Sequence, residues 1–326
     1  MTNTFLFYDI ETSGLNKTFD QVLQFAAIRT DLKLNVIQQH DILIKLSIDT
    51  LLDPQALLVH KLGPHLCKSG IDEYKAIHEI HELMNTPGTI SLGYNTLGFD
   101  DEFLRFKFHQ HLLPPYTHQY ANNCFRADLY PMLIMYYLFK PEIIKWPTTR
   151  SMKLEDLNQA NNFTQGRSHT ALADVEATIG LAKNMLVEND LWQYLLGYFN
   201  KNEDQKRLTR LAKYTNNYQA GILINGAFGW DKKFSTPVYY LGRHQHYKNQ
   251  TIWLNLDNNF QPQQLQQNHL VASHLIIRKK DAEPGFIVPI NRACKLWDEE
   301  FNQQLAINLT CCNNNPAILK PIADHY

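Results

Sequence analysis

The chain has 326 residues, enough for about two domains, and its 44% hydrophobic and 12% aromatic residues exclude global disorder. It contains no apolar run of ~18 residues, so no membrane-spanning helix is expected, and five cysteines without a Cys-x-x-Cys pair argue against a disulfide framework and favour a cytoplasmic location. The net charge is −1, but residues 1–200 are acidic and residues 201–326 are basic. This contrast is typical of an enzyme that holds metal cations in one part and a polyanion in another, or of two soluble domains with different surfaces.

The first 200 residues alternate between segments typical of strands and segments typical of helices. Short runs rich in β-branched and aromatic residues predict strands at Thr4–Ile10, Val22–Arg29, Asn35–Leu46 and Thr89–Tyr94. Apolar residues three or four apart predict helices at Asp72–Met84, Phe99–His111, Leu129–Phe139, Ser151–Ala160 and Thr170–Val187. Three strands followed by alternating helices and strands predict an α/β fold with a mixed sheet flanked by helices.

The pattern changes after residue 200. Lys201–Lys213 predicts a linking helix, and short alternating runs predict strands at Gly221–Phe228, Pro237–Leu241, Thr251–Leu256, His269–Arg278 and Gly285–Ile290. The Gln- and Asn-rich stretch Asn258–Asn268 is interpreted as a loop. We therefore expect two domains, 1–200 and 201–326, the second being small, mostly β and either a barrel or a strongly bent sheet.

Two carboxylates lie near the end of the first predicted strand, at Asp9 and Glu11. Residues two apart on a strand share a face, so both side chains point the same way. Like charges at this spacing repel unless a cation neutralises them, and hard oxygen ligands suit Mg²⁺ or Mn²⁺. By itself, an Asp-x-Glu tripeptide is more often a solvent-exposed loop.

Three further residues stand at junctions between predicted elements. Asp100 follows a predicted strand and opens a helix, a position that also simply favours the helix dipole. His169 and Asp174 lead into the longest predicted helix. Because five residues turn a helix by ~140°, His169 is expected on the preceding turn and Asp174 on the first turns of the helix. Each residue alone is more often structural, but the three elements in this order are specific.

The combination resembles a known family. Asp9 with Glu11, Asn95 and Phe99 with Asp100, and His169 with Asp174 resemble the three motifs of the DEDDh 3′→5′ exonucleases, which have a ribonuclease-H-like fold. Longer segments are similar to the bacterial exonuclease I branch of that family, which is specific for single-stranded DNA; they include Gln24–Asp31, Gly93–Asn95, Arg126–Leu129, Trp146-Pro147 and Ala173–Ile179. The resemblance weakens in the second half, where Gly226–Gly229 stands out and a small barrel resembling a Src-homology domain is implied. The family continues into a helical C-terminal region, and Tyr326 falls where that region would begin.

The resemblance implies hydrolysis of single-stranded DNA from its 3′ end to nucleoside 5′-monophosphates, in DNA repair and recombination. It implies two Mg²⁺ ions, replaceable by Mn²⁺, with Asp9, Glu11 and Asp174 as ligands of the tighter ion and Asp100 acting through water on the second. His169 would take the proton from the attacking water. A monomer in the cytoplasm is expected, with single-stranded-DNA-binding protein as a partner.

Substrate contacts are expected at Glu11, Arg126 and Lys153. Lys153 stands where the family has an arginine, and lysine keeps the charge but loses the bidentate fork for phosphate. Phe103, Phe106 and Phe108 are interpreted mainly as core residues. The basic clusters Lys232-Lys233 and Arg278–Lys280 are either solvated turns or a binding patch.

The remaining histidines, His78, His81, His109, His111 and His118, lack a cysteine framework or paired carboxylates and are interpreted as surface or core residues. Two other functions stay open. One is an exoribonuclease or a proofreading exonuclease of the same fold. The other is a nucleic-acid-binding adaptor without catalytic activity, for which a complete set of four carboxylates and a histidine has no chemical purpose.

Overall fold

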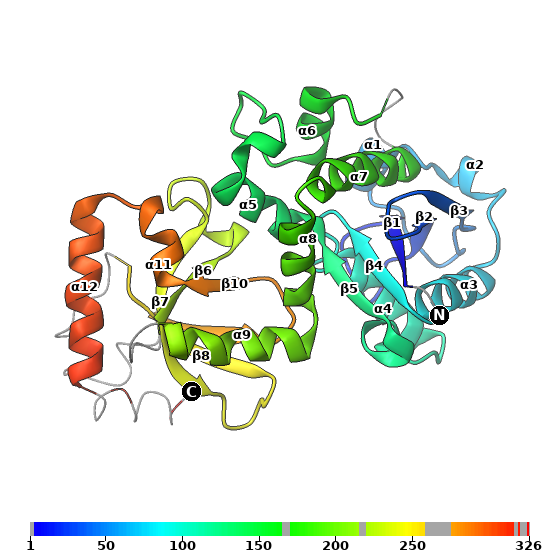
Figure 1. The fold of residues 1–326 in the computed structure, drawn as a ribbon. Helices are drawn as coiled ribbons and strands as arrows, with labels where there is room; N and C mark the ends of the chain where they lie inside the picture. The colour runs from blue at the N-terminus through cyan, green and yellow to red at the C-terminus, as the bar shows by residue number, and fades with distance from the viewer. Residues whose placement is uncertain are drawn as a thin grey trace. The chain divides into compact units, whose positions relative to one another are not determined.

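The computed structural model describes residues 3–164, 170–214, 220–257, 275–315, 319 and 325 (Figure 1). The chain forms two compact units, each described by itself. The first unit comprises Met1–Leu133 and Pro141–Trp192, and the second comprises Ile134–Lys140 and Gln193–Tyr326. Residues 134–140 and 193–200, which the sequence assigns to the first domain, lie in the second unit in this division. In the described part of the chain, no helix combines the length and the apolar character needed to cross a membrane.

The first unit contains a five-stranded mixed sheet with the order β3-β2-β1-β4-β5. Its strands are β1 (Thr4–Thr12), β2 (Val22–Thr30), β3 (Val36–Leu43), β4 (Thr89–Gly93) and β5 (Phe125–Asp128). β2 pairs antiparallel with both β1 and β3, whereas β4 pairs in parallel with β1 and with β5. The carboxyl ends of β1, β4 and β5 therefore meet at one edge of the sheet, the edge at which ligands usually bind in sheets of this kind.

Helices cover both faces of this sheet, which confirms the predicted α/β fold. The helices of this part of the chain are α1 (Pro54–His60), α2 (Pro64–Cys67), α3 (Glu73–Asn85), α4 (Asp100–Gln110), α5 (Leu129–Phe139), α6 (Leu154–Asn161), α7 (Ala171–Leu186) and α8 (Asn189–Leu196). Leu6, Tyr8 and Ile10 of β1 form a core with α3 and α4. α7 packs on β1 and β2 (Figure 1), and Trp192 of α8 contacts Phe5 with ring centroids 5.9 Å apart. Because side chains alternate along a strand, α7 and Trp192 cover the face on which Phe5 lies.

The second unit contains a five-stranded antiparallel sheet with the order β10-β6-β7-β8-β9. Its elements are α9 (Lys201–Tyr214), β6 (Ala220–Ile224), β7 (Ser235–Arg243), β8 (Gln250–Asn255), β9 (Ile276–Lys280), β10 (Phe286–Pro289), α11 (Ile290–Ala293) and α12 (Glu299–Asn314). The ladder between β7 and β8 shifts register between Tyr240 and Gly242, and such a bulge bends a strand. The predicted, mostly β second part is confirmed, whereas α12 was not predicted. The predicted loop Asn258–Asn268 and the first residues of the predicted strand His269–Arg278 lie outside the described residues.

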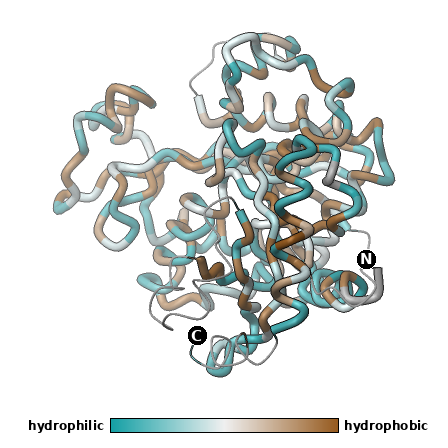
Figure 2. The backbone as a smooth tube through the Cα atoms, turned by 90° about the vertical axis from the view of Figure 1, so that its left-hand side faces the viewer, coloured by the Kyte–Doolittle hydropathy of each residue, from teal (hydrophilic) through white to brown (hydrophobic). Residues whose placement is uncertain are grey.

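The hydropathy of the residues varies along the helices and strands. In Figure 2 hydrophobic (brown) and hydrophilic (teal) stretches alternate along the chain, as expected when each element buries one face. The second unit has its own core, in which Tyr198 and Phe286 stack with ring centroids 4.3 Å apart and Trp253 is buried.

Candidate active site

Asp9 and Glu11 lie on β1, on the face that α7 covers. In the ladder with β2, Asp9 is opposite Ala26 and Glu11 is opposite Gln24, after which the register shifts and the strand ends. Both carboxylates are half-buried, whereas Ile10 between them points into the opposite core. The alternation of the strand therefore brings two acidic side chains to one face at the carboxyl edge of the sheet.

Asp100 is the first residue of α4 and reaches the same strand. Its Oδ1 accepts a hydrogen bond of 3.3 Å from the backbone N–H of Ile10, between Asp9 and Glu11. The loop between β4 and α4 folds tightly onto the strand end: a Cβ on Gly93 would lie 2.2 Å from the Thr96 side chain. A side chain larger than hydrogen at position 93 would therefore displace the loop that carries Asp100.

Asp174 lies in the first turn of α7. Thr170 caps this helix, because its Oγ1 accepts a hydrogen bond of 3.3 Å from the N–H of Ala173 and its carbonyl accepts one of 3.1 Å from the N–H of Asp174. The cap fixes where the helix begins and so places Asp174 within electrostatic reach of Asp9 and Glu11. His169, the residue before the cap, lies outside the described residues.

The pKa values show that these carboxylates crowd one another. Burial, together with the charges of Asp100, Glu11 and Asp174, raises the pKa of Asp9 well above its usual range. Burial and the charge of Asp174 raise the pKa of Glu11 to about 7. Burial also raises the pKa of Asp100 to about 7, although the N–H of Ile10 opposes the change. Such mutual repulsion among hard oxygen donors is what a divalent cation relieves.

The chemistry of the donor set therefore fits a divalent metal ion. In the described ranges, no three His, Cys, Asp or Glu side chains are arranged so that they could hold a metal ion as they stand. The charges of Asp100, Glu11 and Asp174 all reach Asp9, but the four carboxylates do not adopt a ligand geometry by themselves. A metal centre at this edge of the sheet is accordingly a proposal.

A fifth carboxylate, Asp128 at the end of β5, supports the loop that leads to Asp100. Its Oδ1 accepts hydrogen bonds from the N–H groups of Asn95 (2.8 Å) and Tyr130 (2.9 Å), and its Oδ2 accepts one from Leu97 (3.2 Å). Burial raises the pKa of Asp128 to about 6, against the effect of these N–H donors. Asn95 has φ 61°, in the left-handed region that asparagine tolerates better than most residues.

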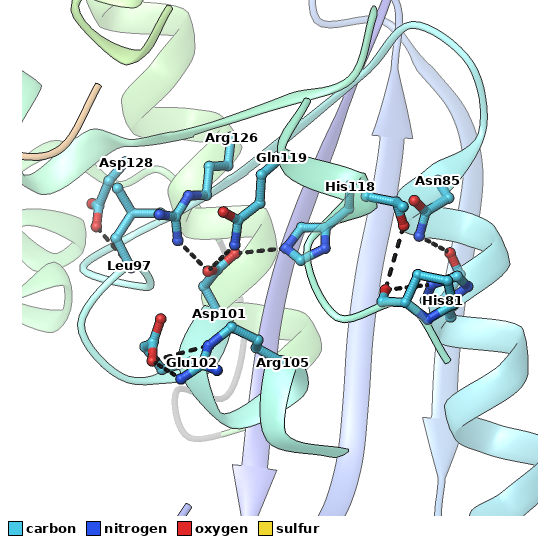
Figure 3. Close-up of polar contacts among 12 residues, drawn as sticks. His81, Asn85, Leu97, Asp101, Glu102, Arg105, His118, Gln119, Arg126 and Asp128 are labelled. Atoms are coloured by element: carbon cyan, nitrogen blue, oxygen red, sulfur yellow. Dashed lines mark hydrogen bonds and ion pairs between the residues drawn. The ribbon is translucent and has the colours of Figure 1, made fainter. Parts of the chain in front are cut away.

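A sixth carboxylate, Asp101, lies beside Asp100 but points into the protein, where it is fully buried. His118 donates to it from Nε2 at 3.0 Å, Gln119 donates from Nε2 at 3.3 Å, and Arg126 forms an ion pair with it (Figure 3). Burial by itself would raise the pKa of Asp101, but the hydrogen bond from His118 and the charge of Arg126 outweigh it and hold the pKa below its usual value. His118 is thus a core residue, as one of the two sequence interpretations had it, but it does have a carboxylate partner.

The predicted substrate contacts differ in their surroundings. The Arg126 side chain is only 12% exposed and pairs with Asp101, so its charge is already engaged within the protein. Lys153 is exposed at the N-cap of α6. The hydroxyl of Tyr94 donates to the carbonyl of Met152, which ties the residue before Lys153 to the end of β4. Lys153 therefore lies at the same edge of the sheet as the carboxylates.

The other candidate residues separate into core and surface. Phe103 and Phe108 are buried in the core beside α3, as predicted, and Phe106 is half-buried under the guanidinium of Arg105, 4.6 Å from its ring centroid. In the second unit, Lys232 pairs with Asp257 at 2.9 Å, and Lys279 pairs with Asp204 at 2.7 Å, with both side chains of the latter pair buried. The basic clusters of the second unit are thus partly neutralised by its own carboxylates.

The chain is similar to known nucleases along most of its length. The family model described as Exonuclease matches residues 6–182. Exodeoxyribonuclease I of Escherichia coli (strain K12) is 31% identical over 335 residues, which cover 98% of this chain and 70% of that protein. Exodeoxyribonuclease I of Buchnera aphidicola subsp. Schizaphis graminum is 34% identical over 259 residues, which cover 77% of this chain and 53% of that protein. The chain thus spans about half to 70% of the length of these two relatives.

Solved structures show the same similarity. The zinc-bound form of E. coli exonuclease I in complex with single-stranded DNA has a TM-score of 0.85 and 28% identity, with 99% of this chain and 73% of that chain covered. A structure of SSB and exonuclease I in complex with an inhibitor has a TM-score of 0.86 and 27% identity, with 99% and 74% covered. The chain belongs to the exonuclease family and, within it, to the exodeoxyribonuclease I proteins.

Proposed function

We propose that the protein is a metal-dependent exonuclease that hydrolyses single-stranded DNA in the 3′→5′ direction to nucleoside 5′-monophosphates, in DNA repair and recombination. The observation that carries the proposal is the clustering of Asp9, Glu11, Asp100 and Asp174 at the carboxyl edge of the sheet. Their charges are close enough to raise the pKa values of Asp9, Glu11 and Asp100. The relatives named exodeoxyribonuclease I, and the solved complex of one of them with single-stranded DNA, support the substrate.

The carboxylate cluster is the proposed metal site. Asp9, Glu11 and Asp174 would hold the tighter of two Mg²⁺ ions, and Asp100 would act on the second through water; Mn²⁺ would substitute. When bound, such ions lower the pKa of a water molecule and neutralise the charge that develops on the phosphodiester. The zinc in the solved E. coli complex supports the capacity of this protein class to bind a divalent cation.

His169 is the proposed general base. It stands directly before Thr170, the cap of the helix that carries Asp174. Histidine is the side chain whose ordinary pKa allows it to accept a proton near neutral pH, so His169 would take the proton of the attacking water. This role rests on the sequence motif, since the residue lies outside the described part of the chain.

Lys153 is the proposed phosphate contact. It is exposed at the edge of the sheet that carries the carboxylates, and within the described residues its ammonium group has no ion-pair or hydrogen-bond partner. Glu11, besides its role toward the metal, would contact the terminal nucleotide. The ion pair of Arg126 with buried Asp101 argues against a direct contact of Arg126 with phosphate and favours a role within the protein.

The proposal also covers a partner protein, the oligomeric state and the location. The solved structure of SSB with exonuclease I supports single-stranded-DNA-binding protein as a partner of this chain. We also propose that the protein acts as a monomer in the cytoplasm.

The proposal is tested with 5′-labelled single-stranded DNA, single-stranded RNA of the same sequence and duplex DNA, each incubated with Mg²⁺ or with EDTA. We expect shortening of the single-stranded DNA alone, and only with Mg²⁺. Equal digestion of RNA would instead indicate an exoribonuclease, and binding without digestion would indicate an adaptor. The Asp9→Ala variant, purified in parallel, controls for contaminating nucleases.

A further inference from the structure

Strand β5 contacts the chain both before and after Asp100 in sequence. The contacted residues are 95–97, which come before Asp100, and Asp101, which comes after it. Arg126 and Asp128 are two apart on β5, opposite Ser91 and Gly93 of β4. Because side chains alternate along a strand, Arg126 and Asp128 point to the same face of the sheet.

Asp128 holds the segment before Asp100. Its two oxygens accept the N–H groups of Asn95 and Leu97, and it is only 2% exposed. These donors belong to a turn with a left-handed residue, which no helix or strand ladder stabilises. The carboxylate therefore supplies acceptors that the backbone of the turn lacks. Figure 3 shows the contact between Asp128 and Leu97.

Arg126 holds the segment after Asp100. Its guanidinium pairs with Asp101, which also accepts hydrogen bonds from His118 and Gln119. The Nδ1 of His118 is buried and has no hydrogen-bond partner among the described residues. The proton of a neutral His118 therefore resides on Nε2, and Arg126 is the permanent cation that balances the buried charge of Asp101.

We propose that Arg126 and Asp128 are positioning residues, which clamp the turn before Asp100 and the first helical turn after it and so hold the Asp100 carboxylate beside β1. The inference rests on the proposed function of the carboxylate cluster and goes beyond it, because it gives roles to two residues outside the four proposed metal ligands. Asp100 reaches the N–H of Ile10 over 3.3 Å, and a small shift of α4 would break this bond. Loss of a residue that orients a metal ligand in this way typically lowers metal affinity or activity ~10–100-fold.

The test separates positioning from direct contact with DNA by changing both partners of one ion pair. Asp101 is fully buried, so it cannot contact a substrate, whereas Arg126 could. If the pair positions Asp100, Arg126→Met and Asp101→Asn share one phenotype: kcat falls ~10–100-fold and the Mg²⁺ concentration for half-maximal activity rises. In EDTA, the affinity for single-stranded DNA and its dependence on salt stay as in the wild type. Calorimetric titration with Mn²⁺ in the absence of DNA should show weaker binding in both variants.

Asp128→Asn tests the other half of the clamp. Asparagine offers one acceptor oxygen and turns an NH₂ group toward N–H donors, so the turn 95–97 should loosen and the same loss of kcat and of Mn²⁺ affinity should appear. The matched control is Arg105→Met, which breaks the more exposed pair of Arg105 with Glu102 (2.5 Å) on the same helix. We expect wild-type kcat and Mn²⁺ affinity for this control.

Two results would overturn the inference. One is a salt dependence of DNA binding that drops by about 0.7 in slope for Arg126→Met but not for Asp101→Asn, which would make Arg126 a phosphate contact. The other is wild-type kcat and Mn²⁺ affinity in folded Arg126→Met and Asp128→Asn. If Arg126→Met does not fold, the double variant Asp101→Asn/Arg126→Met, which leaves no unpaired buried charge, takes its place. Absence of activity in the wild type would instead count against the proposed function, because the Mn²⁺ titration does not depend on activity.

Discussion

The carboxylate of Asp100 accepts a hydrogen bond from the backbone N–H of Ile10, although the two residues are 90 positions apart in sequence. This bond joins the start of α4 to β1 at the point where Asp9 and Glu11 flank Ile10. It explains why the charge of Glu11 raises the pKa of Asp100, and it makes the placement of Asp100 depend on how the loop after β4 is held.

The raised pKa of Glu11 predicts how the stability of the metal-free protein depends on pH. The unfolded carboxyl loses its proton near 4.5, whereas the folded one keeps it up to about 7. The folded state therefore binds more protons at Glu11 between these values. The contribution of Glu11 to stability is fully present below pH ~4.5 and is lost as the pH rises through about 7. Glu11→Gln removes this pH-dependent contribution. The free energy of unfolding of the variant, relative to that of the wild type, should therefore increase by about 2–3 kcal/mol between pH 4.5 and 8.

This prediction is checked by urea unfolding in EDTA at several pH values. Glu176→Gln, which changes an exposed glutamate of α7, is the matched control and should show a difference that does not vary with pH. A stability gain of Glu11→Gln that stays constant or shrinks toward pH 8 would show that the crowding of carboxylates is absent.

Removal of a proposed metal ligand should abolish cleavage without harming the fold. Asp9→Ala and Asp174→Ala each take one charge out of a repelling cluster, so the unfolding temperature of the metal-free protein should stay level or rise. Cleavage of single-stranded DNA should fall below about a tenth of the wild-type rate at saturating Mg²⁺. Asp190→Ala, at an exposed position of α8, serves as control. A variant of Asp9 or Asp174 that keeps more activity than this would contradict the assignment.

His169→Ala should lower kcat by roughly 10²–10⁴-fold, the range for the loss of a general base. Affinity for single-stranded DNA should change little, and the ascending limb of the wild-type pH–rate profile should disappear. The measurement is single-turnover cleavage from pH 5.5 to 9, with DNA binding followed by fluorescence anisotropy. If affinity falls as much as rate does, His169 binds substrate instead of moving a proton.

Lys153 should contribute one phosphate contact. Lys153→Ala should weaken binding of single-stranded DNA and lower the slope of log K against log salt by about 0.7, whereas Lys153→Arg should bind more tightly because its guanidinium can form two parallel hydrogen bonds with phosphate. Lys183→Ala, in an exposed position near the end of α7, is the control and should keep the wild-type slope. Equal slopes for Lys153→Ala and Lys183→Ala would remove Lys153 from the binding groove.

The sequence predicted those parts of the fold that have a strong local pattern. The strands that became β1, β2 and β4 and the helices that became α3, α4 and α7 lie within a few residues of their predicted bounds. The strands are rich in β-branched and aromatic residues, and the helices carry apolar residues three or four apart. β5 was not predicted, since Phe125–Asp128 has four residues, two of them charged, and forms a strand only because β4 offers it a parallel partner. The short helices α1 and α2 were not predicted either, because they are too short to show a regular apolar stripe.

The site also contains residues whose position the sequence predicts and residues whose position it does not. Asp9 and Glu11 share a face because of strand alternation, and this could be predicted from two residues. The supporting residues could not, because Asp101 looks like a second exposed acid at a helix start and Arg126 looks like a free cation until the fold brings them together. One signal was available: Arg126 and Asp128 alternate in the manner of strand residues that share a face, beside a loop that already contained a predicted catalytic carboxylate.

The proposed cleavage of DNA from its 3′ end by the carboxylate cluster can be followed with two forms of one single-stranded oligonucleotide. One form is labelled at the 3′-terminal nucleotide and the other at the 5′-terminal nucleotide, and both are digested with Mg²⁺. We expect the 3′ label to appear as mononucleotide at the first time points while the 5′ label stays in progressively shorter strands, and we expect EDTA or Asp9→Ala to stop both. Early release of the 5′ label, internal fragments, or undiminished digestion by Asp9→Ala would contradict this proposal.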